Sequence, residues 1–109
     1  MEEGRHLSAF PLRLVWKITE VPSSYPAQVA FAVPKKNFAL AVDRNRLKRQ
    51  MRELYRKNKS PLYSLLQQGE KTAALLLIFS GKEKAEYAIL EKKYHQLLTQ
   101  LEEHLKKNI

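Results

Sequence analysis

The segment DRNRLKRQMREL, residues 43–54, combines dense positive charge with regularly spaced apolar residues. Five of its twelve residues are Arg or Lys. Successive side chains of a helix are turned by about 100°, so Leu47, Met51 and Leu54 fall on one narrow stripe. The segment therefore predicts an amphipathic helix, over about residues 44–57, that packs one face on a core and turns the other outward.

The outward face of this helix is cationic. Arg46 lies beyond its central band, and Arg44 lies near the apolar edge. The band consists of Asn45, Lys48, Arg49, Arg52 and Arg56. Like charges four residues apart destabilise a helix by about 0.2–0.5 kcal/mol per pair, and Glu53 relieves only part of this repulsion. Guanidinium groups can donate two parallel hydrogen bonds to phosphate oxygens. A solvated surface helix normally mixes acidic and basic residues, so a bound nucleic acid explains this charge pattern better.

The composition supports a polyanionic partner. The 109 residues fit one domain, and the net charge is +9. Residues 1–60 hold 13 Lys/Arg against 5 Asp/Glu, whereas residues 61–109 hold 7 against 6. The chain has no Cys, no apolar run long enough to cross a membrane and no signal-peptide pattern, which fits a cytoplasmic protein.

Three segments predict strands. PLRLVWKIT (residues 11–19) alternates in hydrophobicity and places Trp16 on its apolar face, and AQVAFAV (residues 27–33) alternates in the same way. The Pro- and Ser-containing loop 20–26 joins them, so they are expected to form an antiparallel pair. The continuous apolar run TAALLLIFS (residues 72–80) is typical of a central strand.

Helix boundaries follow from capping residues. Asp43 is expected to cap the basic helix. Ser60–Pro61 predicts the start of a separate short helix to about Gln68, and Gly69 is a candidate for a left-handed C-cap. A final helix is predicted over about residues 84–106, where apolar residues recur at spacings of three and four.

Together these elements predict an α+β fold, a two-layer sandwich with helices packed on a small sheet. Residues 1–8 are mostly polar and show no hydrophobic periodicity, so no helix or strand is predicted there. Neither His6, His95 nor His104 has metal-ligand partners at useful spacing, and no Gly-rich phosphate loop exists. The sequence therefore predicts no catalytic residue, no metal site and no cofactor bound by the protein itself.

The basic segment also resembles a family signature. A Lys-Lys pair after a strand, a spacer, and the order Ala-x-x-Arg-Asn-Arg-x-Lys-Arg-x-x-Arg-Glu are similar to the signature of the bacterial ribonuclease P protein component. The matching positions are Lys35, Lys36, Ala41, Arg44, Asn45, Arg46, Lys48, Arg49, Arg52 and Glu53. The resemblance covers most of the chain, from about Gly4 to the last helix.

This resemblance implies a function. The family protein is a small accessory subunit of a bacterial ribonucleoprotein endonuclease that removes 5′ leaders from precursor tRNA, and the RNA subunit is the catalyst, with Mg²⁺. The expected partners are ribonuclease P RNA and precursor tRNA, with a protein monomer in a 1:1 ribonucleoprotein and no membrane. The alternatives are a non-catalytic general RNA-binding or chaperone module of similar fold, and a protein that binds duplex DNA through its basic helix.

The resemblance also implies a topology. The family fold, shared with a domain of a ribosomal protein, has a left-handed strand–helix–strand crossover, against the usual right-handed rule. The strands at residues 27–33 and 72–80 would then be parallel neighbours joined across the basic helix.

Site residues are carried over position by position. The expected RNA-docking residues are Lys35, Lys36, Arg44, Asn45, Arg46, Lys48, Arg49 and Arg52, together with Arg56 from the outward band. The candidates for a cleft that binds the single-stranded leader are Arg13, Trp16, Lys17 and Gln28, with aromatic stacking as the expected mode. Trp16 shares a face with Leu12 and Leu14, which favours a core position for it instead.

The sequence departs from the family pattern at three places. The family has an N-terminal helix before the first strand, whereas this chain opens with MEEGRHLSAF, so the helix is expected to be missing from the single domain 1–109. Asn37–Phe38 replace the usual Gly after the lysines, and Asp43 stands where a neutral residue is more typical.

Overall fold

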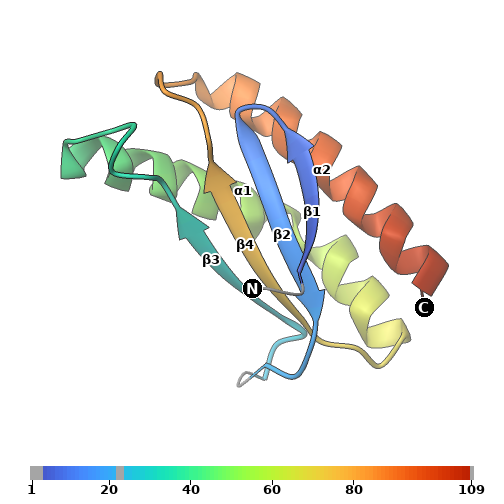
Figure 1. Cartoon of the computed structure of the whole chain (residues 1–109). Coiled ribbons are helices and arrows are strands. Elements are labelled where there is room, and N and C mark those ends of the chain that lie inside the picture. Colours follow the sequence, from blue (N-terminus) through green and yellow to red (C-terminus); the bar gives the residue numbers. More distant parts are fainter. Residues whose placement is uncertain (1–3, 22–23, 109) are drawn as a thin grey trace.

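Four strands form one sheet, and two helices cover one of its faces (Figure 1). The computed structural model describes residues 4–21 and 24–108. The strands are β1 (Arg5–Ala9), β2 (Leu12–Ile18), β3 (Ala27–Ala32) and β4 (Ala73–Phe79), and the helices are α1 (Ala41–Gln68) and α2 (Tyr87–Asn108). The predicted α+β sandwich is confirmed.

The strand order is β1-β2-β4-β3, with β2 antiparallel to both of its neighbours and β3 parallel to β4. The predicted antiparallel pairing of residues 11–19 with residues 27–33 is therefore wrong. β4 lies between them. Its continuous apolar sequence suits this central position, because a central strand is shielded from water by a neighbouring strand at each edge. In Figure 1 the chain leaves β3, passes behind the sheet as α1 and returns to β4 on the right, which makes the crossover left-handed.

Strand β1 was not predicted from the sequence. Its residues alternate between the two faces of the sheet, but only Leu7 and Ala9 are apolar residues turned toward the helices, whereas His6 and Ser8 are exposed. A five-residue edge strand carries too few apolar positions to produce a clear period. Residues 1–3 of the same stretch, like residues 22–23 of the predicted loop, lie outside the described residues.

Helix α1 runs without interruption through Pro61, so the two predicted helices are one. Proline inside a helix removes a backbone donor and costs about 3 kcal/mol. Leu54 before it and Leu62 and Leu66 after it are at most 1% exposed, so both halves of α1 pack firmly on the sheet. This tertiary packing outweighs the local preference for a break at Pro61.

The ends of α1 also differ from the prediction. The N-cap is Leu40, and Asp43 lies in the first turn, where its carboxylate is 2.9 Å from Nζ of Lys84. At the C-terminus Gly69 has φ −88°, while Glu70 takes the left-handed conformation with φ 54°. The amide of Lys71 donates to the carbonyl oxygen of Leu66, which closes the helix in a Schellman arrangement.

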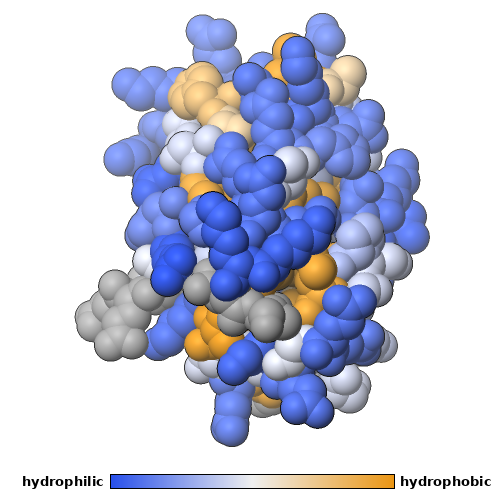
Figure 2. Space-filling view, turned by 90° about the vertical axis from the view of Figure 1, so that its right-hand side faces the viewer, coloured by the Kyte–Doolittle hydropathy of each residue, from blue (hydrophilic) through white to orange (hydrophobic). Residues whose placement is uncertain are grey.

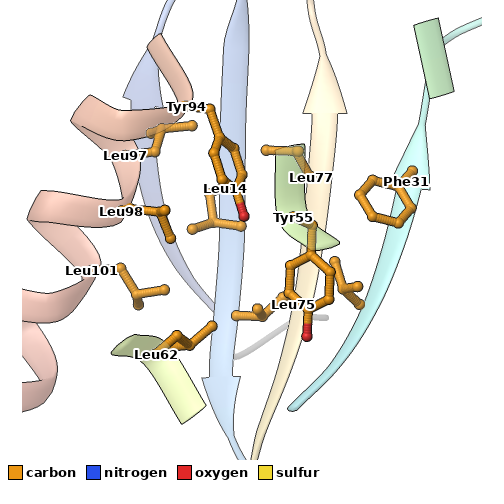
Figure 3. Close-up of a pocket in the computed structure, with 11 residues that line it drawn as sticks. Leu14, Phe31, Tyr55, Leu62, Leu75, Leu77, Tyr94, Leu97, Leu98 and Leu101 are labelled. Atoms are coloured by element: carbon orange, nitrogen blue, oxygen red, sulfur yellow. The ribbon is translucent and has the colours of Figure 1, made fainter. Parts of the chain in front are cut away.

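The core lies between the helices and the sheet. Both helices bury the predicted apolar stripes; on α2 the buried residues are Leu90, Tyr94, Leu97, Leu98, Leu101 and Leu105. Figure 3 shows leucines of β2, β4 and α2 around an enclosed space of only about 10 Å³, so the interior is filled by side chains. On the side that carries α2, the surface is mostly hydrophilic with small separate apolar patches (Figure 2). Among the described helices, none has the length and hydropathy needed to cross a membrane.

Candidate nucleic-acid interface

The buried stripe of α1 fixes the direction of its cationic face. Leu47, Met51 and Leu54 are 2%, 0% and 0% exposed, so α1 cannot rotate about its axis without uncovering them. The side chains on the opposite side line an open hollow: Val42, Asn45, Arg46, Lys48, Arg49 and Arg52. The structure thus brings together five of the predicted docking residues and adds Val42.

The cations at the centre of this hollow are available to an external anion. Arg46 and Arg49 are exposed, and Lys48 is partly exposed. Within the part of the chain that the structure describes, no carboxylate forms an ion pair with any of the three. Since no ion pair with a described carboxylate offsets their mutual repulsion, a bound polyanion would stabilise this arrangement.

Arg44 serves a different purpose from its neighbours. Its Nη1 donates hydrogen bonds to the carbonyl oxygens of Phe38 (2.7 Å) and Ala39 (2.8 Å). These bonds tie the first turn of α1 to the loop that follows Lys35 and Lys36. Arg44 therefore holds the end of this loop against α1, and part of its guanidinium is already occupied.

Arg56 is also engaged within the protein. Its Nη2 and Nε donate to the two carboxylate oxygens of Glu53, at 2.6 and 3.1 Å, and Nζ of Lys57 is 3.9 Å from the same carboxylate. The hydrogen bond from Arg56 lowers the pKa of Glu53. Because the charge of Arg56 is largely compensated, this residue is a weaker candidate for phosphate binding than Arg49 or Arg52.

The loop lysines lie at the end of β3. Lys35 and Lys36 are exposed, and Lys36 lines an open hollow with Asn37 and with Lys82 from the β4–α2 loop. Lys82 is not among the docking residues predicted from the sequence. The signal was available, because β3 and β4 were expected to be parallel neighbours, and loops that follow parallel neighbours leave the sheet at the same edge.

The candidates for a leader cleft are divided between the two faces of the sheet. Arg13, Lys17 and Gln28 lie on the face without helices, and Lys17 and Gln28 flank Ala74 in one row across the strands. Arg13 donates from Nη2 to Nδ1 of His6 at 3.2 Å when His6 carries its proton on Nε2.

Trp16 lies on the other face and is only 3% exposed. Its ring packs 6.1 Å from that of His104, and the guanidinium of Arg5 lies 5.6 Å from its centroid. The interpretation of Trp16 as a core residue is confirmed, and its candidacy for the leader cleft is withdrawn because no ligand can reach it without unpacking α2.

The described residues offer no cluster of three or more His, Cys, Asp or Glu side chains that could hold a metal ion. Burial raises the pKa of Tyr94, and burial together with the hydroxyl of Tyr63 raises that of Tyr55. Both phenols therefore stay protonated around neutral pH and cannot act as general bases. The exposed cations of α1 support anion binding.

Comparisons with known proteins agree with this geometry. The family model described as Ribonuclease P matches residues 1–107. The ribonuclease P protein component of Porphyromonas gingivalis is 30% identical over 99 residues, covering 91% of this chain and 72% of that protein. The corresponding protein of Chlorobium phaeobacteroides is 48% identical over 68 residues. This match covers 62% of this chain and 44% of the Chlorobium protein.

Solved structures show the same fold. The RNase P protein from Thermotoga maritima matches with a TM-score of 0.70 at 23% identity, over 91% of this chain and 84% of that one. The RNase P protein of Staphylococcus aureus matches with a TM-score of 0.70 at 16% identity, over 92% of this chain and 83% of the Staphylococcus protein. The fold, the arginine-rich helix and the family match converge, and the chain belongs to the ribonuclease P protein component family, an RNA-binding family that takes part in tRNA processing.

Proposed function

We propose that this chain is the RNA-docking subunit of ribonuclease P and that it binds the catalytic RNA through the outward face of α1. The observation that carries the proposal is the open hollow in which Arg46, Lys48 and Arg49 form no ion pair with a carboxylate of residues 4–21 or 24–108. A helix fixed on the sheet by a buried stripe presents these charges in one defined orientation, which suits a folded RNA with a defined arrangement of phosphates.

The 5′ leader of the precursor would bind on the sheet face that carries no helix. Arg13, Lys17 and Gln28 supply cationic and amide groups there, on strands β2 and β3. The RNA would supply the catalytic groups and hold Mg²⁺, since the described protein residues offer no cluster of side chains that could hold a metal ion. The protein would act as a monomer in a 1:1 ribonucleoprotein.

Reconstitution with the cognate RNA at low Mg²⁺ tests this proposal. Adding the protein should raise the rate of precursor-tRNA cleavage, because its cations replace part of the Mg²⁺ that neutralises the assembled RNA phosphates. The double variant Arg46→Gln/Arg49→Gln should lose most of this stimulation, whereas Lys92→Gln/Lys106→Gln on α2 is the matched control with the same loss of charge. Unchanged cleavage on adding wild-type protein would contradict the proposal.

Competition separates the alternatives. A ribonuclease P subunit should prefer its RNA over an unrelated structured RNA and over duplex DNA at ~150 mM salt, where contacts to phosphates alone weaken steeply. Equal competition by unrelated structured RNA would favour a general RNA-binding or chaperone module. Preference for duplex DNA would favour the third possibility, binding of a duplex by the basic helix.

A further inference from the structure

Four aromatic rings form a continuous strip where α1 packs beside strand β3. Ring centroids are 6.3 Å apart between Tyr25 and Tyr63, 6.5 Å between Tyr63 and Tyr55, and 6.3 Å between Tyr55 and Phe31. The hydroxyl groups of Tyr55 and Tyr63 are 3.0 Å apart, within hydrogen-bonding distance. The strip therefore links the end of the loop before β3 to the middle of α1 and has a fixed geometry.

Two cations lie over this strip. Nζ of Lys59 is 5.9 Å from the ring centroid of Tyr25 and 5.6 Å from that of Tyr63. At the other end, the guanidinium carbon of Arg52 is 5.5 Å from the ring centroid of Phe31. Such cation–ring contacts are weak at exposed positions, and they hold positive charge next to aromatic faces.

The strip opens toward solvent on one side. Tyr25 is 60% exposed, and Phe31, Tyr55 and Tyr63 are partly exposed. Figure 3 shows Phe31 on β3 beside Tyr55, at the margin of the packed interior. β3 is an edge strand, so among the residues that the structure describes no further strand pairs with its outer edge. Packing accounts for the partly buried rings, whereas most of the surface of Tyr25 is accessible to a ligand.

We propose that this aromatic strip binds an unpaired stretch of the RNA that docks on α1, with a base stacked on Tyr25 and phosphates near Lys59 and Arg52. The inference rests on the proposed function, because Arg52 belongs both to the docking hollow and to the strip, which makes the two surfaces continuous. Aromatic rings interleaved with cations are the arrangement that single-stranded nucleic acids require, since each base offers a ring face and each linkage a charge. A duplex would offer no free ring face to Tyr25, because its bases already stack on one another.

The test uses two labelled probes of equal length, an oligouridylate and an abasic oligomer that has the same backbone without bases. Fluorescence anisotropy gives the affinity of the full chain for each. The wild-type protein should bind the base-bearing probe about tenfold more tightly than the abasic probe, which corresponds to one stacked base. Tyr25→Leu should remove this preference and leave abasic binding unchanged, and Tyr25→Phe should retain it.

Phe10→Leu is the matched control, since Phe10 is 72% exposed and lies at the opposite end of the sheet from Tyr25. It should bind both probes like the wild type. A wild-type protein that binds the two probes equally, or a Tyr25→Leu variant with unchanged preference, would overturn the proposal. Circular dichroism of each variant verifies that the fold is retained.

The source of the RNA is tested with the ribonuclease P RNA alone, without precursor tRNA. Tyr25→Leu should weaken binding of this RNA about tenfold. Unchanged affinity would overturn the assignment to the RNA subunit. The two hypotheses can fail separately. The double variant Arg46→Gln/Arg49→Gln tests RNA docking on α1 and leaves the four rings intact, whereas Tyr25→Leu tests base stacking on the aromatic strip.

Discussion

The two helices pack on the same face of one sheet by the same device, yet their outward faces differ. Each presents a stripe of buried apolar residues to the core. Outside that stripe, α1 carries eight Lys/Arg against two Asp/Glu, whereas α2 carries four against three. The mixed surface of α2 is what a solvated helix needs, and the excess on α1 is not explained by folding.

This contrast indicates that packing of α1 and the proposed RNA binding would depend on different residues of one helix. The inward residues of α1 are of the same chemical type as those of α2, because both sets are apolar side chains that fill the core. The outward residues Asn45, Arg46 and Arg49 could be exchanged for those of α2 without loss of packing. The following changes test whether the two roles are as separate as the structure indicates.

The largest expected effect concerns the core. Met51→Ala and Leu97→Ala should each lower the free energy of unfolding by about 2–5 kcal/mol, because both side chains are 0% exposed and truncation leaves a cavity. Urea denaturation measures the loss. The exposed Arg49→Ala should stay within about 0.5 kcal/mol of the wild type. A large loss for Leu97→Ala with almost none for Met51→Ala would break the comparison, since α1 would then be held by something other than its stripe.

The next effect concerns binding. Arg49→Ala should weaken binding of ribonuclease P RNA by about 1.5–3 kcal/mol, the range for hydrogen bonds to charged groups, and reduce the salt slope by about 1. Lys92→Ala, which removes an exposed charge from α2, should leave both quantities unchanged. RNA titrations at several salt concentrations provide the measurement. Equal losses for the two variants would mean that only net charge matters and that the face of α1 has no special role.

A smaller effect separates Arg44 from the other arginines. Arg44→Ala removes two hydrogen bonds to loop carbonyl oxygens and should lower the free energy of unfolding by about 1 kcal/mol. Its effect on RNA affinity should be smaller than that of Arg49→Ala, because part of its guanidinium is occupied in the free protein. Urea denaturation and RNA titration of both variants make the comparison. Full stability combined with a large loss of affinity would identify Arg44 as a direct docking residue instead.

Much of the fold followed from local patterns, and the failures have a common cause. The spacing of Leu47, Met51 and Leu54 predicted which face of α1 is buried, because helix geometry alone fixes that relation. Alternation predicted strands β2 and β3 but not their neighbours, since pairing depends on where β4 inserts. Pro61 predicted a helix break that packing on both sides of it prevents.

The candidate site shows the same limit. Helical periodicity gave the direction of Arg44 and Arg56 but not their partners, which are the carbonyl oxygens of the β3–α1 loop and the carboxylate of Glu53. The departures from the family pattern also acquire reasons only in three dimensions. Phe38 is buried, with its ring 5.6 Å from that of Phe79, and Asp43 pairs with Lys84.

The smallest expected effect tests whether the second half of α1 compensates its own charge. The bond from Arg56 lowers the pKa of Glu53 below its usual value of 4.5, so the carboxylate stabilises the fold above about pH 4.5. This contribution disappears as the pH falls through the lowered pKa, because the protonated acid no longer attracts Arg56. The stability difference between wild type and Glu53→Gln, followed by urea denaturation across this pH range, should therefore shrink toward zero in acid. The same comparison in an Arg56→Gln background should show a weaker pH dependence, since among the described residues Lys57, 3.9 Å away, is then the cation that still pairs with Glu53. An unchanged pH dependence in that background would show that Arg56 does not hold the carboxylate, and it would return Arg56 to the set of cations available for RNA.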